Sequence, residues 1–405
     1  MKASAGPVRV LLISDSYPPV LGGSEIEAQR VSAAMIRRGH QVQVLCAGGP
    51  PMPDVRDWVD PMGVPVSILT RRSRGVQKDR IFACEIAWAL WSRRNSYDVV
   101  YFLMQGLHLA AGLPVARFLG KPMTVKIAGS NVIPQMRRHR AGRWELDWMQ
   151  KWQVPVMILN DGMVEEGLAD GFRREQLVWM PNPVDIDEFR PAHAGEAASW
   201  RKSHGIPVEK PVAIYVGRMS REKGLRELLR GFAQAVRVAP EALLLMVGDG
   251  AMRPELEALA QELGLSPEQI RFVGRVDAKE IPFWLRASDV FALTSPSEGF
   301  ACALLEGMSV GLSSVVSAIP ANLQLVDEGV HGLTAAFDDE QTIGSAFVQL
   351  FRDPQLRERM GSAARQRVVE NYSTDRVVER YEALFARMMS ATPQSGQFSA
   401  ASRSI

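Results

Sequence analysis

The sequence predicts an α/β fold with two doubly wound domains, each a parallel sheet with helices on both faces. Short apolar runs alternate with stretches of helical period along most of the chain, and a polar segment over residues 191–210 splits them into two series. Strands that alternate with helices favour parallel sheets of this kind. The length of 405 residues gives room for two such domains.

The first series opens with a strand, a glycine turn, a helix and a second strand. Residues 8–13 are mostly valine, leucine and isoleucine, which is typical of a buried parallel strand. Gly22 and Gly23 then precede Ser24, which we expect to cap the helix. Residues 42–46 supply the second strand and complete a βαβ unit.

Further strands follow in both series. In the first we expect them at residues 99–103, 123–127, 156–159 and 177–180, and in the second at residues 212–216, 243–247, 270–273, 290–293 and 314–317. Glycine and other turn residues follow most of them. Ligands of doubly wound folds bind beyond the carboxyl ends of the strands, so we expect the ligand-binding site at these turns.

These elements set the predicted domain organisation. We expect an N-terminal Rossmann-like domain over residues 1–190 and a C-terminal Rossmann-like domain over residues 191–372. A final helix is expected over residues 373–390, and the polar residues 391–405 are expected to be disordered.

The composition excludes several classes of protein. Hydrophobic residues make up 46% and charged residues 23%, which is ordinary for a globular protein. No run of about 18 apolar residues is present, and the run at residues 8–13 is too short for a secretory signal, so we expect a cytoplasmic protein. Cys46, Cys84 and Cys302 are far apart, which argues against a thiolate zinc site and a disulfide scaffold.

The net charge of +2 indicates no special partner, and we expect no nucleic acid. Basic residues nevertheless cluster at residues 71–74, 93–94 and 137–143, where they can face an anionic surface or only solvent. Four large apolar residues adjoin the last cluster: Trp144, Trp148, Met149 and Trp152. Aromatic and basic residues together suit peripheral contact with an anionic membrane, the alternative being an amphipathic helix that packs on its own domain.

Two glycine-containing loops have the chemistry of a phosphate site. Gly22 and Gly23 stand before a helix, whose free N–H groups and dipole attract a phosphate, although turn glycines are also common without any ligand. In the second series, Arg218 follows a strand and Lys223 comes five residues later. Arginine offers planar bidentate bonds and lysine a point charge, so together they suit a diphosphate; a solvated loop is the alternative.

A third segment carries two glutamates eight positions apart. Glu298 stands next to Gly299, which permits a tight turn, and Glu306 lies about one and a half turns inside the helix expected from Ala301. One carboxylate can contact a sugar and the other a ribose diol. A fourth segment, Val273-Gly274-Arg275, ends an apolar strand and can accept the plane of a base, or form only a turn.

In this order, the segments resemble the retaining family-4 glycosyltransferases of the GT-B fold (glycosyl transferases group 1). The resemblance runs from about Val8 to Met389 and is carried by these segments: Gly22-Gly23-x-Glu25, Arg37-Arg38-Gly39-His40-Gln41-Val42, Pro181-Asn182-Pro183-Val184-Asp185, Gly217-Arg218 with Lys223-Gly224, Val247-Gly248-Asp249-Gly250, Ala287-Ser288-Asp289-Val290, and Glu298-Gly299-Phe300 with Glu306.

The resemblance implies two parallel-sheet domains that face each other across a cleft, with the final helix crossing back to the first domain. It implies transfer of a sugar, with retention, from a UDP- or GDP-sugar to a hydroxyl acceptor in glycan, polysaccharide or glycolipid biosynthesis. Lipid-linked acceptors are among those expected. The expected catalytic residues are Arg218, Lys223 and Glu298, with the two cations on the leaving diphosphate.

The remaining donor contacts are also implied by the resemblance. Glu306 is expected on the ribose, residues near Val273, Gly274 and Arg275 on the base, and Gly22 and Gly23 over the diphosphate. Next to Gly299, the backbone of Phe300, Ala301 and Cys302 is expected on phosphate and sugar. No cofactor and no metal are expected, and Asp185-Ile186-Asp187, although it matches D-x-D, is interpreted as linker.

The chain departs from the family pattern on the acceptor side. Ala128 stands where many relatives have a histidine, in a stretch like HGS, so Lys126, Ser130 and Asn131 are candidates for contact with the acceptor. Two alternatives stay open. One is a GT-B nucleotide-sugar epimerase, in which Arg218, Lys223 and the paired carboxylates can also serve. The other is a non-catalytic relative that binds a nucleotide sugar, which the departure at Ala128 favours.

Overall fold

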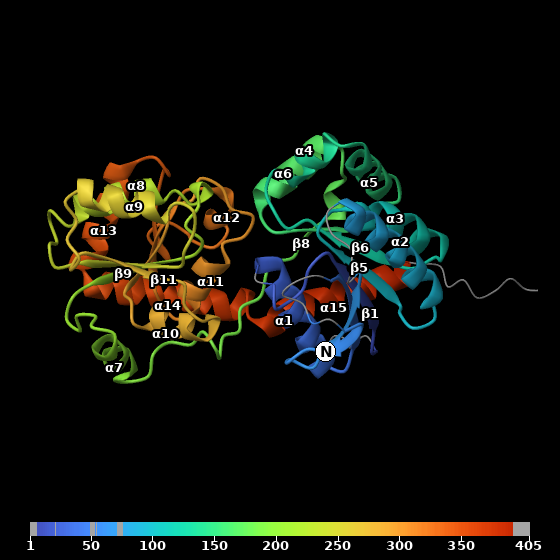
Figure 1. The fold of residues 1–405 in the computed structure, drawn as a ribbon, viewed down its shortest axis with the longest axis horizontal. Coiled ribbons are helices and arrows are strands. Elements are labelled where there is room, and N and C mark those ends of the chain that lie inside the picture. Colours follow the sequence, from blue (N-terminus) through green and yellow to red (C-terminus); the bar gives the residue numbers. More distant parts are fainter. Residues whose placement is uncertain (1–5, 21, 49–52, 54, 71–75, 392–405) are drawn as a thin grey trace, which may run out of the picture. The chain divides into compact units, whose positions relative to one another are not determined.

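The computed structural model describes residues 6–20, 22–48, 53, 55–70 and 76–391, so the predicted disordered tail lies outside the described residues apart from residue 391. The chain forms two α/β units (Figure 1). The first consists of Met1–Leu159, Met163–Asn182 and Asp375–Ile405, and the second of Asn160–Gly162 and Pro183–Thr374.

The first unit is built on a sheet with the strand order β3-β4-β2-β1-β5-β6-β7-β8. Its strands are β1 (Arg9–Ser14), β2 (Gln41–Ala47), β3 (Asp57–Val59), β4 (Pro65–Leu69), β5 (Val99–Leu103), β6 (Met123–Lys126), β7 (Val156–Ile158) and β8 (Leu177–Trp179). All pairings are parallel except that of β3 with β4. The chain therefore winds in one direction from β1 to β2 and in the other from β5 to β8.

Helices connect these strands and cover the sheet (Figure 1). They are α1 (Gly23–Arg37), α2 (Val76–Ser92), α3 (Leu107–Phe118), α4 (Val132–Arg137), α5 (Arg140–Lys151), α6 (Asp161–Asp170) and a short 3-10 turn η1 (Arg174–Gln176). The last helix, α15 (Thr374–Ala391), packs in the core of this unit from Asp375 onward.

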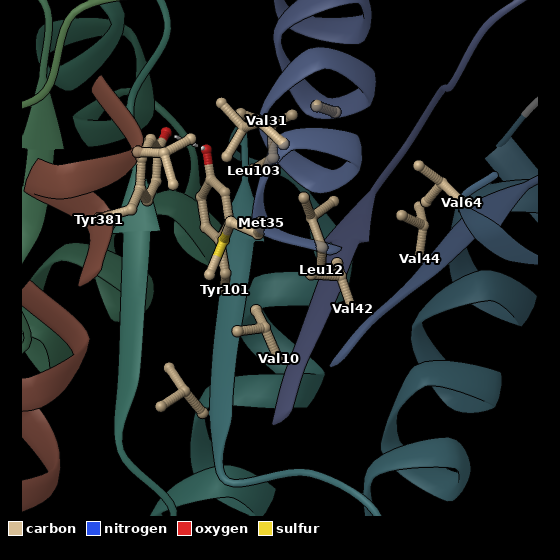
Figure 2. Packing of buried hydrophobic residues seen from close by; sticks show 14 of the residues in the cluster. Val10, Leu12, Val31, Met35, Val42, Val44, Val64, Tyr101, Leu103 and Tyr381 are labelled. Carbon is tan, nitrogen blue, oxygen red and sulfur yellow. Dashed lines mark hydrogen bonds between the residues drawn. The ribbon is translucent and has the colours of Figure 1, made fainter. Parts of the chain in front are cut away.

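The core of the first unit joins α1, the central strands and α15. Val10, Leu12 and Tyr101 of the strands pack with Val31 of α1 and Tyr381 of α15 (Figure 2). The rings of Tyr101 and Tyr381 have centroids 5.7 Å apart, and their hydroxyl oxygens are 3.2 Å apart. The strands need no alternation of polar residues because both faces of the sheet are covered.

The segment Arg37 to Val42, one of those that carry the family resemblance, has a structural role. Nδ1 of His40 accepts a hydrogen bond from the backbone N–H of Val8 at 3.1 Å, which leaves Nε2 as the protonated nitrogen, 2.9 Å from Oε1 of Glu382. Arg38 also donates to Glu382. These contacts tie the start of β1, the turn after α1 and helix α15 together.

The second unit has the strand order β11-β10-β9-β12-β13-β14, all parallel. Its strands are β9 (Val212–Val216), β10 (Leu243–Val247), β11 (Ile270–Gly274), β12 (Val290–Leu293), β13 (Ser313–Ser317) and β14 (Gly332–Ala335). Its helices are α7 (Glu196–Ser203), η2 (Arg221–Lys223), α8 (Leu225–Ala235), α9 (Arg253–Glu262), η3 (Ala278–Glu280), α10 (Ile281–Arg286), α11 (Cys302–Ser309), α12 (Pro320–Leu323), α13 (Glu340–Arg352) and α14 (Pro354–Asn371).

The predicted α/β class with two doubly wound parallel sheets is confirmed, and the predicted strands are present within one or two residues. The expected cap at Ser24 is wrong: α1 begins at Gly23, with Gly22 in the cap position and no side-chain hydrogen bond at that cap. Within the described ranges, no helix has both the length and the apolarity needed to cross a membrane.

Candidate functional site

The carboxyl ends of β9 and β12 meet through a very close backbone approach. Gly224 has a φ of +60°, and a Cβ built on it would lie 2.1 Å from the carbonyl oxygen of Thr294. The hydroxyl of Thr294 in turn donates to the carbonyl of Gly224 at 2.7 Å. Only glycine fits here, because any other residue would meet the neighbouring backbone in a conformation that L residues disfavour. The loop that carries Lys223 is thereby fixed beside the end of β12.

This approach brings two of the predicted catalytic residues together. Nζ of Lys223 lies 2.7 Å from Oε1 of Glu298, and the hydroxyl of Ser295 donates to the same carboxylate oxygen at 2.7 Å. Ser295 is fully buried, while the side chains of Lys223 and Glu298 are 21% and 10% exposed. The ammonium group is therefore partly desolvated and held by a charged partner, yet still reachable from solvent.

Arg218 lies at the end of β9, exposed, two residues after the strand. The buried Tyr215 donates from its hydroxyl to the carbonyl of Arg218 at 2.9 Å. Burial raises the pKa of Tyr215, and the charges of Glu298 and Glu222 raise it further while Arg218 opposes them. Arg218 and Glu298 therefore both lie near Tyr215, at the same end of the sheet.

The loop between Arg218 and Lys223 also carries an acidic residue. Hydrogen bonding by Ser220 and by its own backbone lowers the pKa of Glu222, and Arg218 and Lys223 contribute as cations. The loop therefore carries both predicted cations close to one carboxylate.

The segment after Glu298 leads into α11. Gly299 is half-buried, Phe300 and Ala301 are buried, and Cys302 starts the helix. No side-chain hydrogen bond caps this end of the helix, and the backbone N–H of Cys302 donates to the carbonyl of Phe300 at 3.0 Å. Glu306 lies four residues after Cys302, on the same face of α11, and is half-buried.

The predicted base-binding segment ends β11, two strands away from β9. Gly274 has a φ of +85°, and its carbonyl accepts from the N–H of Gly248 at 2.8 Å. A Cβ on Gly248 would lie 2.0 Å from the carbonyl oxygen of Gly217. The loops after β9, β10 and β11 are thus packed backbone to backbone. Val273 is half-buried and Arg275 exposed at this edge.

In the first unit, the predicted glycine pair lies at the start of α1. Gly22 is extended, and a Cβ on it would lie 2.2 Å from Oε2 of Glu25. The carboxylate of Glu25 accepts a hydrogen bond from the hydroxyl of Ser16, in the loop after β1. The glycine pair therefore leaves room for Glu25 to fold back over the first turn of the helix.

Lys126, a candidate for acceptor contact, lies in the core instead. Its side chain is fully buried, forms an ion pair with Glu27 of α1, and donates to Oδ1 of Asn182 at 3.0 Å. Tyr381 of α15 donates to the same carboxylate of Glu27 at 2.6 Å. This network joins β6, α1, the end of the first unit and α15.

The other acceptor candidates follow β6. Asn131 has a φ of +63°, is exposed, and donates from its backbone N–H to Glu166 at 2.7 Å. Ser130 is half-buried directly before it. Both lie beyond the carboxyl end of the strand, where doubly wound folds bind ligands.

A cluster that the sequence analysis missed lies at the ends of β1 and β5. Nδ1 of His108, a residue 1% exposed, is 2.9 Å from Oδ1 of Asp15, which is half-exposed. Glu145 of α5 is buried beside them, and burial raises its pKa to about 7, opposed by the charge of His108. Gly106 permits the approach, since a Cβ there would lie about 3 Å from both His108 and Asp15. No linear motif links these positions, which only the fold brings together.

Asp185, in the segment that matches D-x-D, has a structural role in the linker. Asp185 accepts backbone N–H bonds from Asp187 and Glu188, so it closes a turn in the linker. No group of three or more histidine, cysteine or acidic side chains suited to a metal occurs among the described residues.

The basic and aromatic cluster on α5 is largely engaged in the first unit. Met149 is fully buried, and Arg137 is ion-paired with Asp170 and Asp147. The rings of Trp144, Trp148 and Trp152 stack in a ladder, of which Trp144 is 51% exposed. The helix thus packs on its own domain through one face, and Trp144 is its main exposed apolar group.

The sequence matches two known protein families. Residues 196–367 match the family described as Glycosyl transferases group 1, and residues 21–188 match Glycosyltransferase Family 4. An uncharacterized glycosyltransferase of Methanocaldococcus jannaschii is 21% identical over 92% of this chain and 96% of its own length. The alpha-D-kanosaminyltransferase of Streptomyces kanamyceticus is 26% identical over 71% of this chain and 79% of its own.

A solved structure shows the same fold at low sequence identity. The crystal structure of Anabaena HepE in complex with UDP and glucose superposes with a TM-score of 0.77 and 18% identity, covering 94% of this chain and 100% of that chain. Together with the two parallel-sheet units, this likeness establishes the GT-B fold.

Proposed function

The chain belongs to the group 1 glycosyltransferases of family 4, with the GT-B fold, and we propose that it is a retaining glycosyltransferase that uses a UDP- or GDP-sugar. The acceptor is a hydroxyl group in glycan, polysaccharide or glycolipid biosynthesis. The observation that carries the proposal is the Lys223–Glu298 ion pair at the ends of β9 and β12. Both side chains keep some exposure to solvent, and both are positioned at the edge where such folds bind ligands.

In the proposed reaction, the bond from the anomeric carbon to the β-phosphate oxygen breaks and the acceptor oxygen bonds to the same face of that carbon. The acceptor proton passes to the leaving phosphate, so no enzyme nucleophile is needed. Negative charge grows on the diphosphate as the bond breaks, and we propose that Arg218 and Lys223 stabilise it as preorganised cations. Glu298 orients Lys223 and contacts the donor sugar.

The other donor contacts follow from the same strand ends. We propose that the N-terminal amides of α11 meet phosphate and sugar, that Glu306 binds the ribose, and that Val273 to Arg275 accept the base. Since Arg218 and Lys223 supply two positive charges, we propose that no metal ion is required. Gly22 and Gly23 are proposed to contribute from the first unit.

We also propose a cytoplasmic location with peripheral contact to an anionic membrane and a lipid-linked acceptor. Cys84 is exposed and, like Cys46 and Cys302, is a free thiol, which suits a reducing compartment. The basic clusters of the first half supply the charge that anionic lipid attracts.

The test is a thermal-shift screen of the full chain with UDP- and GDP-sugars, followed by product analysis with any donor that stabilises it. Stabilisation should grow with the logarithm of donor concentration. Sugar on an acceptor together with free nucleoside diphosphate, in the presence of EDTA, supports the proposal. A changed sugar still attached to its nucleotide indicates an epimerase, and binding without turnover indicates a non-catalytic relative.

A further inference from the structure

Helix α2 presents an apolar stripe to solvent. Ile81, Trp88 and Trp91 are 42%, 68% and 44% exposed, and Cys84 between them is exposed as well. Their spacing of three and four residues places all four on one face of the helix. Single exposed apolar residues are ordinary, but a row of four with two tryptophans is not.

The opposite face of α2 accounts for its packing, so the stripe is not needed for the fold. Phe82, Ile86 and Leu90 are at most 2% exposed and lie on the inner side. Inside the first unit, α2 lies beside α3 (Figure 1). A Cβ built on Gly112 of α3 would lie 3.4 Å from the side chain of Leu90.

Helix α3 extends the stripe at its end. Phe118, the last residue of α3, is 78% exposed, and its ring stacks on Trp91 with centroids 6.0 Å apart. The guanidinium of Arg94 lies 5.3 Å from the centre of the Trp91 ring. The apolar surface therefore continues across two helices and ends under an arginine. We call Ile81, Cys84, Trp88, Trp91 and Phe118 the α2 stripe.

Basic residues stand at both ends of the α2 stripe. Arg93, Arg94 and the exposed Arg117 lie at one end. At the other end are Lys78 and the exposed Arg80. Tryptophan with arginine or lysine at its rim is the combination that favours the boundary between lipid headgroups and acyl chains.

We propose that the α2 stripe, rather than the aromatic cluster on α5, is the surface through which this protein binds an anionic lipid bilayer. This inference rests on the proposed membrane contact but not on transferase activity. The bilayer is favoured over a protein partner because the stripe is flanked by cations at both ends, which suits an anionic plane. On α5, by contrast, one tryptophan is exposed, and Arg137 at the end of the preceding helix α4 is ion-paired with two aspartates.

The test compares binding of the full chain to vesicles of phosphatidylcholine alone and with 30% phosphatidylglycerol. We expect W88S/W91S to weaken binding to the anionic vesicles at least about tenfold, from the lost apolar burial. R94E/R117E, at two exposed arginines, should weaken it similarly, and added salt should weaken the wild type. The matched controls on α5, W144S and R138E/R140E, should stay within about twofold of the wild type.

Cys84 offers a second readout that does not depend on substitution of tryptophan. An environment-sensitive fluorophore on its thiol should brighten and shift to the blue with anionic vesicles, and a C84S protein taken through the same labelling should show no such change. Since the substituted side chains are exposed, circular dichroism and melting temperature should match the wild type for every variant.

The outcomes distinguish membrane binding itself from the assignment of that binding to the α2 stripe. Loss of binding in the α5 variants with retention in the α2 variants overturns the assignment to α2 while keeping membrane contact. No binding of the wild type to anionic vesicles overturns both. A dimer in solution that W88S/W91S dissociates overturns the bilayer in favour of a second copy of the chain.

Discussion

Lys223 donates from its Nζ to Oε1 of Glu298 at 2.7 Å, although the two residues are 75 positions apart in the chain. The contact depends on Gly224, because only glycine at this position lets the loop after β9 approach the end of β12. Lys223 and Glu298 thereby form an ion pair between the ends of two strands. The proposed chemistry requires this ion pair, because a lysine that is held in place loses less conformational entropy when it binds a phosphate than a flexible lysine does.

Lys223→Ala should lower the turnover of sugar transfer at least about 10²-fold, the scale of losing one preorganised charge donor at a transition state. Steady-state kinetics with the donor found by the thermal-shift screen gives the number. Arg221→Ala, two positions earlier and exposed, removes the same charge from the same loop and should leave turnover within a few fold. Near-native turnover of the Lys223 variant would remove this residue from the mechanism.

Gly224→Ala should both destabilise the second unit and reduce activity. The added Cβ would meet the carbonyl oxygen of Thr294 in a left-handed conformation, so we expect a loss of roughly 2 kcal/mol or more in the free energy of unfolding. Denaturant titration measures it. Gly264→Ala is the control, because Gly264 has a φ of +73° with nothing within 4 Å of its Cβ. Equal losses in the two variants would show that the close approach to Thr294 is unimportant.

Glu145 should make stability depend on pH near neutrality. Its pKa is raised from 4.5 to about 7, so its favourable contribution is complete below about pH 4.5 and is lost as the pH rises through 7. Compared with Glu145→Gln, the wild type should lose on the order of 3 kcal/mol between pH 4.5 and 8. Urea unfolding of both proteins at several pH values tests this. Parallel pH profiles would show that Glu145 has the same pKa in the folded and the unfolded protein.

The contact of Glu382 with Arg38 and His40 should stabilise the first unit at neutral pH. Hydrogen bonding from Arg38, and less so from His40, lowers the pKa of Glu382, so its contribution is present above about pH 4.5 and is lost as the pH falls further. Glu382→Gln should cost about 1 kcal/mol at pH 7 and less at pH 3.5. Glu379→Gln on the same helix is the control, because Glu379 forms its ion pair with the exposed Arg376. A cost independent of pH would indicate lost packing in place of lost charge.

Much of the fold could be predicted because each sheet is buried on both faces. Strands such as β5 and β9 are continuous apolar runs, and the sequence places them without error at Val99–Leu103 and Val212–Val216. Strand β3 was not predicted, since Asp57–Val59 is an edge strand of three residues, too short to show a pattern, and takes its structure from pairing with β4. The β-propensity of single residues is a weak predictor where pairing with a neighbouring strand determines the structure.

The candidate site likewise contains some residues that the sequence predicts and others whose contacts only the fold reveals. Lys223 and Glu298 stand next to glycines at strand ends, a signal that the sequence itself contains. Lys126 also follows a strand, but its burial against Glu27 depends on where α1 packs, which no local pattern reveals. The cluster of Asp15, His108 and Glu145 likewise needs three elements distant in the sequence to meet.

The most direct test of the central claim is a crystal structure of the full chain with UDP or GDP, whichever stabilises it. We predict the diphosphate at the carboxyl ends of β9 and β12, with phosphate oxygens within hydrogen-bond distance of Lys223 and Arg218 and the base beside Gly274. A diphosphate bound away from Lys223, Arg218 and the start of α11 would contradict the account.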